Sequence, residues 1–443
     1  MVMEIEILRH DEDLSERPSA SRDFAQFICK INHLKELILY GSYHDDFYST
    51  LSLLASTTKI EILRHEEDLS EHPSASRDFA QFICKMNHLK ELILDSSYHD
   101  DFYSTLSSMA STTKVISIRM FLHDLSERPS ASRDFAQFIC KLNHRKNLRL
   151  DRRYHDDFYS TLSSIASTTK IEILHHNEDL SERPSASRDL ALFVCKMNHL
   201  KNLTLDGSYH DDFYSTSSMA STRKIEILHH NDDLNERPSA SRDLALFICK
   251  MNRLKNLTLN GSYHVDFYYT SSSVASTVKD DCNTSSTVTD LTVTDRTREG
   301  WQDCGSMFDI VKRITIQVWR TIRCDVIHRI HLPAATELTI HTVKYAKQPA
   351  SLHDDPTSLP NALRKVSPQL VKVTLRNINI GNDQTERMIQ AFRSSDDLKH
   401  LRTLRFLRCG TDESFDSSCI DSNGEHKITV DIVHGKPLGK RLR

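Results

Sequence analysis

The sequence predicts an α/β solenoid in which parallel strands line a concave face and helices form the convex face. Three observations lead to this fold class. First, the phrase SERPSASRD at 15–23 recurs almost unchanged four more times, and its prolines lie 55, 56, 55 and 54 residues apart. Second, each copy contains two strand-like and two helix-like segments. Third, no single copy can bury its apolar side chains alone, so the copies must stack against one another.

Two segments of each copy have the pattern of strands. In the first copy, HLKELIL at 33–39 has the arrangement L-x-x-L-x-L, which recurs in every later copy. The second strand, TKIEIL at 58–63, alternates Ile60 and Ile62 with charged residues, which is the period of a strand buried on one face. We therefore expect Ile60 and Ile62 to point into the core and Leu63 to point toward the concave side.

The other two segments have the period of amphipathic helices. SASRDFAQFICKI at 19–31 places large apolar residues at i, i+3, i+4 and i+7 from Phe24, and Ser21 is positioned to cap the helix. DDFYSTLSLLAS at 45–56 forms a second apolar stripe behind two acidic residues, which favour a helix N-terminus. Each copy therefore reads strand, helix, strand, helix.

These repeats resemble leucine-rich repeats of the ribonuclease-inhibitor-like type, which have an L-x-x-L-x-L strand followed by an amphipathic helix. Consecutive strands are 23 residues apart from Leu37 to Ile60 and 32 residues apart from Ile60 to Leu92, so two units of alternating length fill each copy. The resemblance covers 1–280, as five near-identical double repeats. It implies a horseshoe-shaped solenoid without a catalytic site.

The remaining region, 281–443, reads as divergent repeats followed by a C-terminal tail. A Ser/Thr-rich stretch at 270–290 separates it from the regular copies, and Pro356 and Pro360 indicate a loop in its longest interval. Strand-like runs return at intervals of 23, 24, 35, 31 and 24 residues. Their central residues are Leu291, Ile314, Leu338, Val373, Leu404 and Ile428.

Composition argues for a protein partner. The chain has 443 residues, of which 27% are charged, and a formal net charge of -4, so nothing in its balance attracts nucleic acid or anionic lipid. No segment resembles a signal peptide or a membrane-spanning helix, and ten cysteines without a C-x-x-C pair indicate a reducing compartment. We expect a cytoplasmic protein that binds neither nucleic acid nor membrane. The sequence does not predict an oligomeric state.

The motifs of catalysis are missing from the sequence. GKPLGKR at 435–441 is one residue short of a phosphate-binding loop, HEEDL at 65–69 lacks the second histidine of a zinc-protease helix, and no G-x-S-x-G occurs. We therefore predict no enzyme, no cofactor and no metal site. The repeated histidines, in HHNED at 175–179 and its counterparts, read as solvated turns and helix starts. The repeated cysteines read as reduced core residues and are Cys29, Cys84, Cys140, Cys195 and Cys249.

The remaining candidate site is the concave face itself. Strand residues that alternate with the buried leucines must point away from the helices, and these residues differ between copies that are otherwise nearly identical. We expect an acidic row beside exposed leucines, which together provide charged and apolar contacts for a protein or microbial ligand. The predicted contact residues are Glu36, Ile38, Glu61, Leu63, Glu91, Ile93, Arg149, Glu172, Leu174, Thr204, Glu226, Leu228 and Thr258.

The array as a whole resembles the C-terminal leucine-rich region of NOD-like (NACHT) receptors. That resemblance implies a non-catalytic scaffold for protein interaction or ligand sensing in intracellular innate immunity. No nucleotide-binding domain precedes the repeats, and the sequence begins in mid-repeat, so we expect a fragment or a stand-alone paralogue. The alternative is the substrate adaptor of a ubiquitin ligase, or another scaffolding solenoid.

Overall fold

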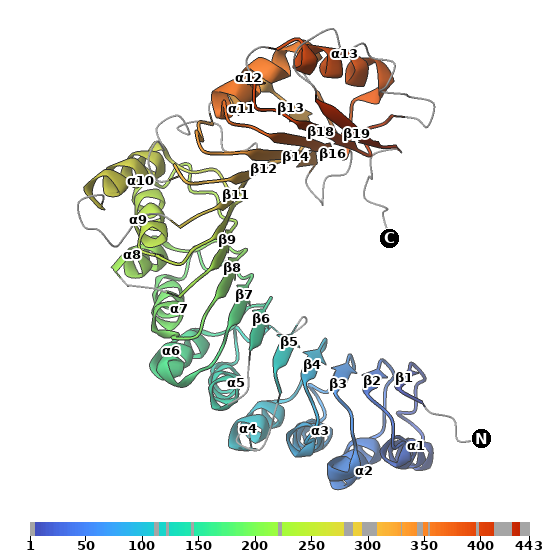
Figure 1. The fold of residues 1–443 in the computed structure, drawn as a ribbon. Coiled ribbons are helices and arrows are strands. Elements are labelled where there is room, and N and C mark those ends of the chain that lie inside the picture. The colour runs from blue at the N-terminus through green and yellow to red at the C-terminus, as the bar shows by residue number, and fades with distance from the viewer. Residues whose placement is uncertain are drawn as a thin grey trace. The chain divides into compact units, whose positions relative to one another are not determined.

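The chain divides into two compact units, Met1–Lys224 and Ile225–Arg443, which we call unit 1 and unit 2. Parallel strands alternate with helices in both units of this computed structural model (Figure 1). The fold is therefore an α/β solenoid of the leucine-rich-repeat type, as the sequence predicts. The structure describes residues 5–109, 115–120, 124–142, 146–219, 224–278, 287–294, 308–328, 330–342, 349–352, 355–395, 398–411 and 428–434.

The strands of unit 1 follow one another in chain order, and each pairs in parallel with the next. The helices of this unit all lie on one side of the strands (Figure 1). Unit 1 curves so that the helices are on the outside, which agrees with the predicted convex face. Its described strands are β1 Ile7–His10, β2 Glu36–Leu39, β3 Ile62–His65, β4 Glu91–Leu94, β5 Ser117–Met120, β6 Asn147–Leu150, β7 Ile173–His176 and β8 Asn202–Leu205.

The helices of unit 1 begin in two ways. The odd-numbered helices start at a proline. Proline suits this position because the N–H that it lacks would have no partner within the first helical turn. The even-numbered helices have aspartates in the first turn, as expected. The described helices are α1 Pro18–Lys30, α2 Asp45–Leu54, α3 Pro73–Lys85, α4 Asp100–Met109, α5 Pro129–Lys141, α6 Asp156–Ile165, α7 Pro184–Lys196 and α8 Asp211–Met219, with short 3-10 turns η1 Ala55–Thr57 and η3 Ala166–Thr168.

Ser21 has a different role from the predicted cap. The helix already begins at Pro18, so Ser21 lies inside it and is fully buried. Its hydroxyl donates to the carbonyl of Leu14 at 3.0 Å and accepts the N–H of His44 at 3.2 Å. Later copies repeat this pair of bonds, so the serine ties together the loops that precede two successive helices.

The second strand of each copy is shifted from the predicted register. Leu63 pairs with Leu37 on one side and with Leu92 on the other, so successive strands are 26 and 29 residues apart, not 23 and 32. Ile60 is buried just before β3 begins, and Leu63 and His65 are buried within it. The buried residues of the second strand therefore have the same spacing as those of the first. The pattern is I-x-x-L-x-H in place of L-x-x-L-x-L. Ile62 points out of the core instead of into it.

Unit 2 continues the strand–helix alternation with less regular spacing. Its main sheet has the order β9-β10-β11-β12-β14-β16-β18-β19 among the described residues, and a second sheet has the order β13-β15-β17. The strands are β9 Ile227–His230, β10 Asn256–Leu259, β11 Asp290–Thr294, β12 Arg313–Val318, β13 Thr321–Ile322, β14 Glu337–Thr342, β15 Ala350–Leu352, β16 Lys372–Arg376, β17 Ile378–Asn379, β18 Thr403–Leu407 and β19 Thr429–Val433. The helices are α9 Pro238–Cys249, α10 Val265–Val278, α11 Cys324–Ile327, α12 Leu359–Val366 and α13 Gly381–Arg393, with the 3-10 turn η5 Pro356–Ser358.

Most central residues of the divergent strands are confirmed. Leu291, Ile314, Leu338, Val373 and Leu404 all occupy equivalent positions in consecutive strands of the sheet. The last prediction is two residues off, because Val430 and not Ile428 pairs with Leu404. Pro356 and Pro360 do not mark an open loop, since they begin η5 and lie in the first turn of α12.

The sequence predicts a boundary at residue 280 because the repeats become less regular there. The structure divides after Lys224, where one compact unit ends and the next begins. The predicted boundary at residue 280 therefore stays a prediction. The motif at 435–441 and residues 279–286 of the Ser/Thr-rich stretch lie outside the described residues.

Candidate functional site

The candidate site is the side of the unit 1 strands that faces away from the helices, which we call the strand face. Two rows of side chains cross it, because every strand contributes its first and third residues. The first row is Ile7, Glu36, Ile62, Glu91, Ser117, Asn147, Ile173 and Asn202. The second row is Arg9, Ile38, Arg64, Ile93, Arg119, Arg149, His175 and Thr204.

Three of the predicted contact residues are not on this face. Leu63, Leu174 and Leu228 are all 0% exposed and pack in the core. The prediction was wrong because it continued the alternation from Ile60, whereas the chain takes three residues to pass from one buried position to the next at this point. Ile62, Ile173 and Ile227 take their place as outward residues, and the last two are each 37% exposed.

Other predicted residues lie where they were expected. Glu36, Ile38, Glu91, Ile93, Arg149 and Thr204 are half-buried members of the two rows, and Thr258 has the equivalent position in unit 2. Glu61, Glu172 and Glu226 lie one residue before their strands. Glu61 and Glu172 form part of the border of the strand face, and Glu226 has the equivalent position in unit 2.

The border is not the acidic row that the sequence suggested. Glu61 pairs with Lys90 at 2.8 Å, Glu172 with Lys201 at 3.0 Å, and Glu226 with Lys255 at 3.1 Å. Hydrogen bonds from Lys90 and Lys201 lower the pKa of the Glu61 and Glu172 carboxyls below the usual range. Glutamates and lysines therefore alternate along the border and cancel much of its charge. These exposed pairs contribute little to stability.

The second row carries most of the positive charge of the face. Arg64 binds Glu66 at 2.7 Å and Asp95 at 3.0 Å, just beyond the ends of the strands. Farther along, Arg149 binds Asp151. Positive side chains of the second row are thus held in place by carboxylates on the side of the face opposite to the lysines.

His175 lies between two of these carboxylates. Its Nε2 is 3.4 Å from Asp151 and 3.5 Å from Asp206. Burial alone would raise the pKa of Asp151, but hydrogen bonds from His175 and Arg149 hold it below its usual value. The first histidine of HHNED is therefore part of the strand face and not of a solvated turn.

The second histidine of this motif is inside the core, contrary to the prediction. His65, His176 and His230 are all 0% exposed and occupy the last buried position of their strands. His65 Nδ1 lies 2.8 Å from the Tyr98 hydroxyl, and its Nε2 lies 2.9 Å from the Tyr48 hydroxyl. When Tyr48 donates its proton to Glu67, His65 donates from Nε2 and accepts at Nδ1.

This buried chain runs Tyr98, His65, Tyr48, Glu67 and recurs as Tyr209, His176, Tyr159, Glu178. Burial lowers the pKa of His65 to about 3, so the imidazole is neutral. Burial also raises the pKa of Glu67 to about 7, against hydrogen bonds from Tyr48 and the Tyr43 N–H that act in the opposite direction. The sequence contained one signal that was missed, namely the position of His65 where the first strand has a buried leucine.

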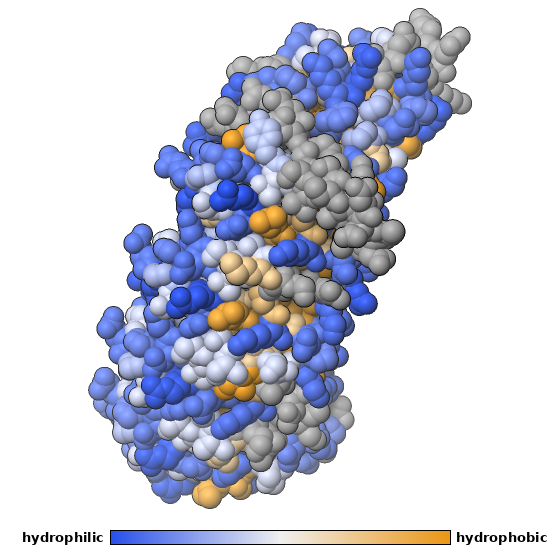
Figure 2. Space-filling model, turned by 90° about the vertical axis from the view of Figure 1, so that its left-hand side faces the viewer, coloured by the Kyte–Doolittle hydropathy of each residue, from blue (hydrophilic) through white to orange (hydrophobic). Residues whose placement is uncertain are grey.

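The helix side of unit 1 is largely hydrophilic and has an ion pair that recurs between copies. Figure 2, viewed from the side where the unit 1 helices lie, shows a largely hydrophilic surface with apolar residues between the charged ones. The same ion pair recurs from copy to copy, as Arg22–Asp46 at 2.6 Å and Arg133–Asp157 at 2.5 Å. On the strand face, copies one and two have the same residues, for example Ile38 and Ile93, and the second row changes farther along, to Arg149 and Thr204.

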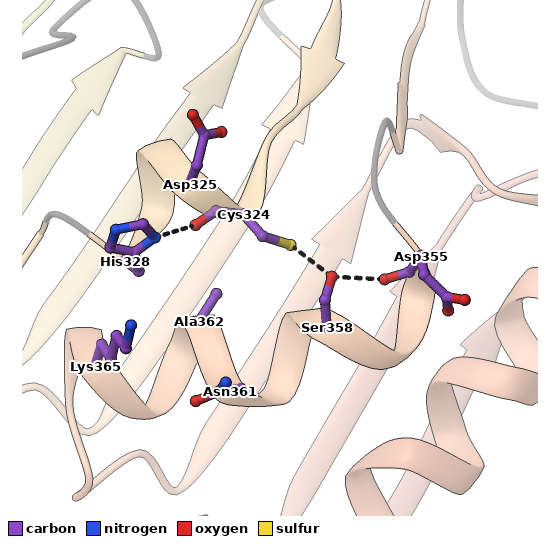
Figure 3. A pocket seen from close by; sticks show the side chains of 8 residues that line it. All are labelled: Cys324, Asp325, His328, Asp355, Ser358, Asn361, Ala362 and Lys365. Carbon is purple, nitrogen blue, oxygen red and sulfur yellow. Dashed lines mark hydrogen bonds between the residues drawn. The ribbon is translucent and has the colours of Figure 1, made fainter.

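Unit 2 contains a pocket of about 390 Å³ beside α11 and α12 (Figure 3). Ser358 donates to the Cys324 sulfur at 3.3 Å, and His328 Nδ1 lies 3.1 Å from the Cys324 carbonyl oxygen. The histidine therefore contacts the backbone of Cys324 and does not form a base–thiol pair with it through this nitrogen. The lining residues are Cys324, Asp325, His328, Asp355, Ser358, Asn361, Ala362 and Lys365.

Comparison with known proteins adds little to this picture. No family model matches the sequence, and no curated protein matches it. Among solved structures, the chain is similar to one in the crystal structure of the yeast Rad7 and Elc1 complex, with a TM-score of 0.32 and 11% identity over 94% of this chain and 92% of that one. At this degree of similarity the comparison assigns no function, and the fold class is established by strand order and register.

Two further features are absent from the described residues. These residues contain no group of three or more His, Cys, Asp or Glu side chains placed to hold a metal ion. They also contain no helix with both the length and the apolar character needed to cross a membrane.

Proposed function

We propose that this chain is a non-catalytic scaffold that binds a protein partner through the strand face of unit 1. The observation that supports this most strongly is the internal comparison of the copies. One helix-side ion pair recurs from copy to copy, whereas the second row has isoleucine at Ile38 and Ile93 and then changes to Arg149 and Thr204 at equivalent positions. A surface that only had to fold would be free to repeat like the rest of the copy.

The chemistry of the strand face also suits a protein. Half-exposed isoleucines lie among arginines and carboxylates that are already paired with one another. Apolar anchors surrounded by charge are the usual composition of a binding hot spot and its rim.

The test uses a double variant, Ile93→Glu with Arg149→Glu, because both side chains are on the strand face and neither is in the core. The charge reversal Arg77→Glu on the helix side is the matched control, since Arg77 is exposed and pairs only with Asp101 there. A partner captured with the unchanged protein should be lost with the double variant and kept with the control, at equal circular dichroism. Loss with the control alone contradicts the proposal.

Two finer roles are proposed as hypotheses. The first is the sensing region of a NOD-like receptor, with an intracellular location and a microbial or host ligand. The second is the substrate adaptor of a ubiquitin ligase, the kind of assembly that leucine-rich solenoids also serve. Stable association with ligase subunits in the captured complex would favour the second role over the first.

A further inference from the structure

The first half of the strand face has an ordered arrangement that its composition does not suggest. Isoleucines alternate between the two rows, with Ile7 on β1, Ile38 on β2, Ile62 on β3 and Ile93 on β4. We call this zigzag the isoleucine track. Ile7 is 61% exposed, and the other three are half-buried on the same face.

Charge is separated on the two sides of the track. Where a strand has its isoleucine in the second row, its first-row residue is a glutamate, namely Glu36 or Glu91. Where the isoleucine is in the first row, the second-row residue is an arginine, namely Arg9 or Arg64, and Arg119 continues this side on β5. Carboxylates therefore flank the track on one side and guanidinium groups on the other.

The arginines are positioned before any partner arrives. The guanidinium groups of Arg9 and Arg64 lie over the Tyr40 ring at 4.5 and 5.5 Å from its centroid. Arg64 also has an Nε that is buried without a hydrogen-bond partner among the described residues. The ion pairs of Arg64 with Glu66 and of Arg119 with Glu91, at 2.7 and 3.3 Å, are partly exposed and cost little to exchange.

The spacing of the track selects the secondary structure of its partner. Neighbouring strands lie about 4.8 Å apart, and an α-helix advances about 5.4 Å per turn, so successive turns of a helix laid across the strands meet successive isoleucines. In an extended strand, the side chains on one face repeat about every 6.7 Å, which does not match the spacing between neighbouring strands of the sheet. Five strands then correspond to about 13 residues of helix.

We propose that the isoleucine track docks an amphipathic α-helix of the partner that has one acidic and one basic flank. The apolar stripe of this helix, at i, i+3, i+4 and i+7, lies on the isoleucines. Its acidic flank meets Arg9, Arg64 and Arg119, and its basic flank meets Glu36 and Glu91. This inference rests on the proposed function and adds the chemistry of the partner to it.

The probe is a fluorescein-labelled 18-residue helical peptide with a leucine stripe, glutamates on one flank and lysines on the other. Three control peptides have glutamates on both flanks, lysines on both flanks, or glutamines in place of the leucines. Fluorescence anisotropy with the full chain should show the first peptide binding at least tenfold more tightly than each control. Equal affinities for the four peptides would overturn the proposal.

Variants of the protein locate the binding. Ile62→Glu and, separately, Ile93→Lys should each weaken binding of the first peptide at least tenfold. Asn202→Glu, at the far end of the same row on β8, is the matched control and should change it less than twofold. Arg64→Glu should shift the preference toward the peptide with lysines on both flanks. Unchanged binding to Ile62→Glu and Ile93→Lys, with native circular dichroism, contradicts the docking site.

Failure of this inference is distinguishable from failure of the proposed function. If no peptide binds but a captured partner still depends on Ile93 and Arg149, the helical partner is wrong and the strand face still binds protein. If the captured partner depends on Arg77 instead, the proposed function itself is wrong.

Discussion

The regular copies and the later strands of unit 2 bury different chemistry at the same place in the sheet. In the regular copies the last buried position is a histidine in β3, β7 and β9, and His65 and His176 each lie in a chain of tyrosine and glutamate side chains. In the later strands of unit 2 the corresponding residues are apolar, namely Ile316, Ile340 and Leu375.

This difference explains why one half of the chain repeats closely and the other does not. A buried hydrogen-bonded chain requires every member, because a lost partner leaves a polar group unsatisfied. Apolar contacts are non-directional, and similar side chains replace one another at modest cost. The members of the buried chain are therefore constrained together, whereas the apolar residues of the later strands can be replaced by similar side chains.

The largest expected effect comes from exchanging these two chemistries. His65→Leu leaves the Tyr48 and Tyr98 hydroxyls without their imidazole partner and should destabilise its part of unit 1 by about 2 to 4 kcal/mol. Ile340→Leu in unit 2 keeps the core apolar and should cost less than about 1.5 kcal/mol. Hydrogen exchange, measured peptide by peptide in the full chain, gives the loss of local stability in each variant. Equal losses would show that the two regions do not differ in this way.

A second effect concerns the weak end of the regular copies. Leu51 is buried in α2, but the equivalent residues are serines, Ser217 in α8 and Ser271 in α10, and both are also buried. A missing leucine costs about 2 to 5 kcal/mol, and in a solenoid the loss stays local. Exchange should therefore be faster in 211–219 and 265–271 than in 45–54.

Restoring the leucine tests the same point. Ser217→Leu and Ser271→Leu should slow exchange of their own helices about tenfold, which corresponds to about 1.4 kcal/mol. The control is Ser108→Leu in α4, which places a leucine at an exposed position where copy one already has the exposed Leu53. Uniform exchange across 45–54 and 211–219 in the unchanged protein would contradict the comparison.

The buried glutamate and histidine also predict opposite pH dependences. The pKa of Glu67 is about 7 in the fold against 4.5 outside it, so the folded state holds an extra proton between these values and loses stability as pH rises through them. The pKa of His65 is about 3 against 6.5, so the unfolded chain holds the extra proton there and stability rises with pH. Between pH 4.5 and 6.5 the two contributions to the pH dependence of stability have opposite signs and cancel.

Glu67→Gln separates the two contributions. Relative to the variant, the unchanged protein should lose stability as pH rises from 4.5 to about 7, and the difference should be constant below 4.5. Urea unfolding of both proteins at a series of pH values gives this difference directly. A difference that is independent of pH would show that Glu67 titrates normally in the fold.

The smallest effect concerns the repeated cysteines, which we predict to stay reduced. Burial raises the pKa of Cys29 to about 11 and that of Cys84 to about 12, so neither thiol is ionised near neutral pH. A thiol reagent followed by mass spectrometry should label Cys29 slowly and Cys84 more slowly still, because Cys84 is the more buried. A native disulfide between them would contradict the register of the helices.

The fold could be predicted from the sequence because the leucine pattern determines it residue by residue. Leu37 and Leu92 of the first strand type and Leu291 to Leu404 of unit 2 were placed correctly, since each lies in an unambiguous L-x-x-L-x-L or alternating run. The second strand type failed because IEIL fits two registers, one with Ile62 buried and one with Leu63 buried.

That one error changed the predicted site. It placed Leu63 on the surface, left Ile62 out of it, and treated His176, the second histidine of HHNED, as solvated. The partners that bury His65 are Tyr48 and Tyr98, which are 17 and 33 residues away, so no local pattern identifies them. The neutralising pair of Glu61 and Lys90 was missed for the same reason, because it appears only when neighbouring strands are aligned correctly.

The register of β3 decides which residues form the strand face, and cysteine labelling across it tests this most directly. Ile62→Cys, Leu63→Cys and Arg64→Cys place a small thiol at three consecutive positions, and cysteine is well tolerated in a core. Under native conditions we expect the cysteines at 62 and 64 to react quickly and the one at 63 to react only as fast as the protein opens. Rapid labelling at 63 with protection at 62 would contradict the assigned register, the isoleucine track and the strand face built on them.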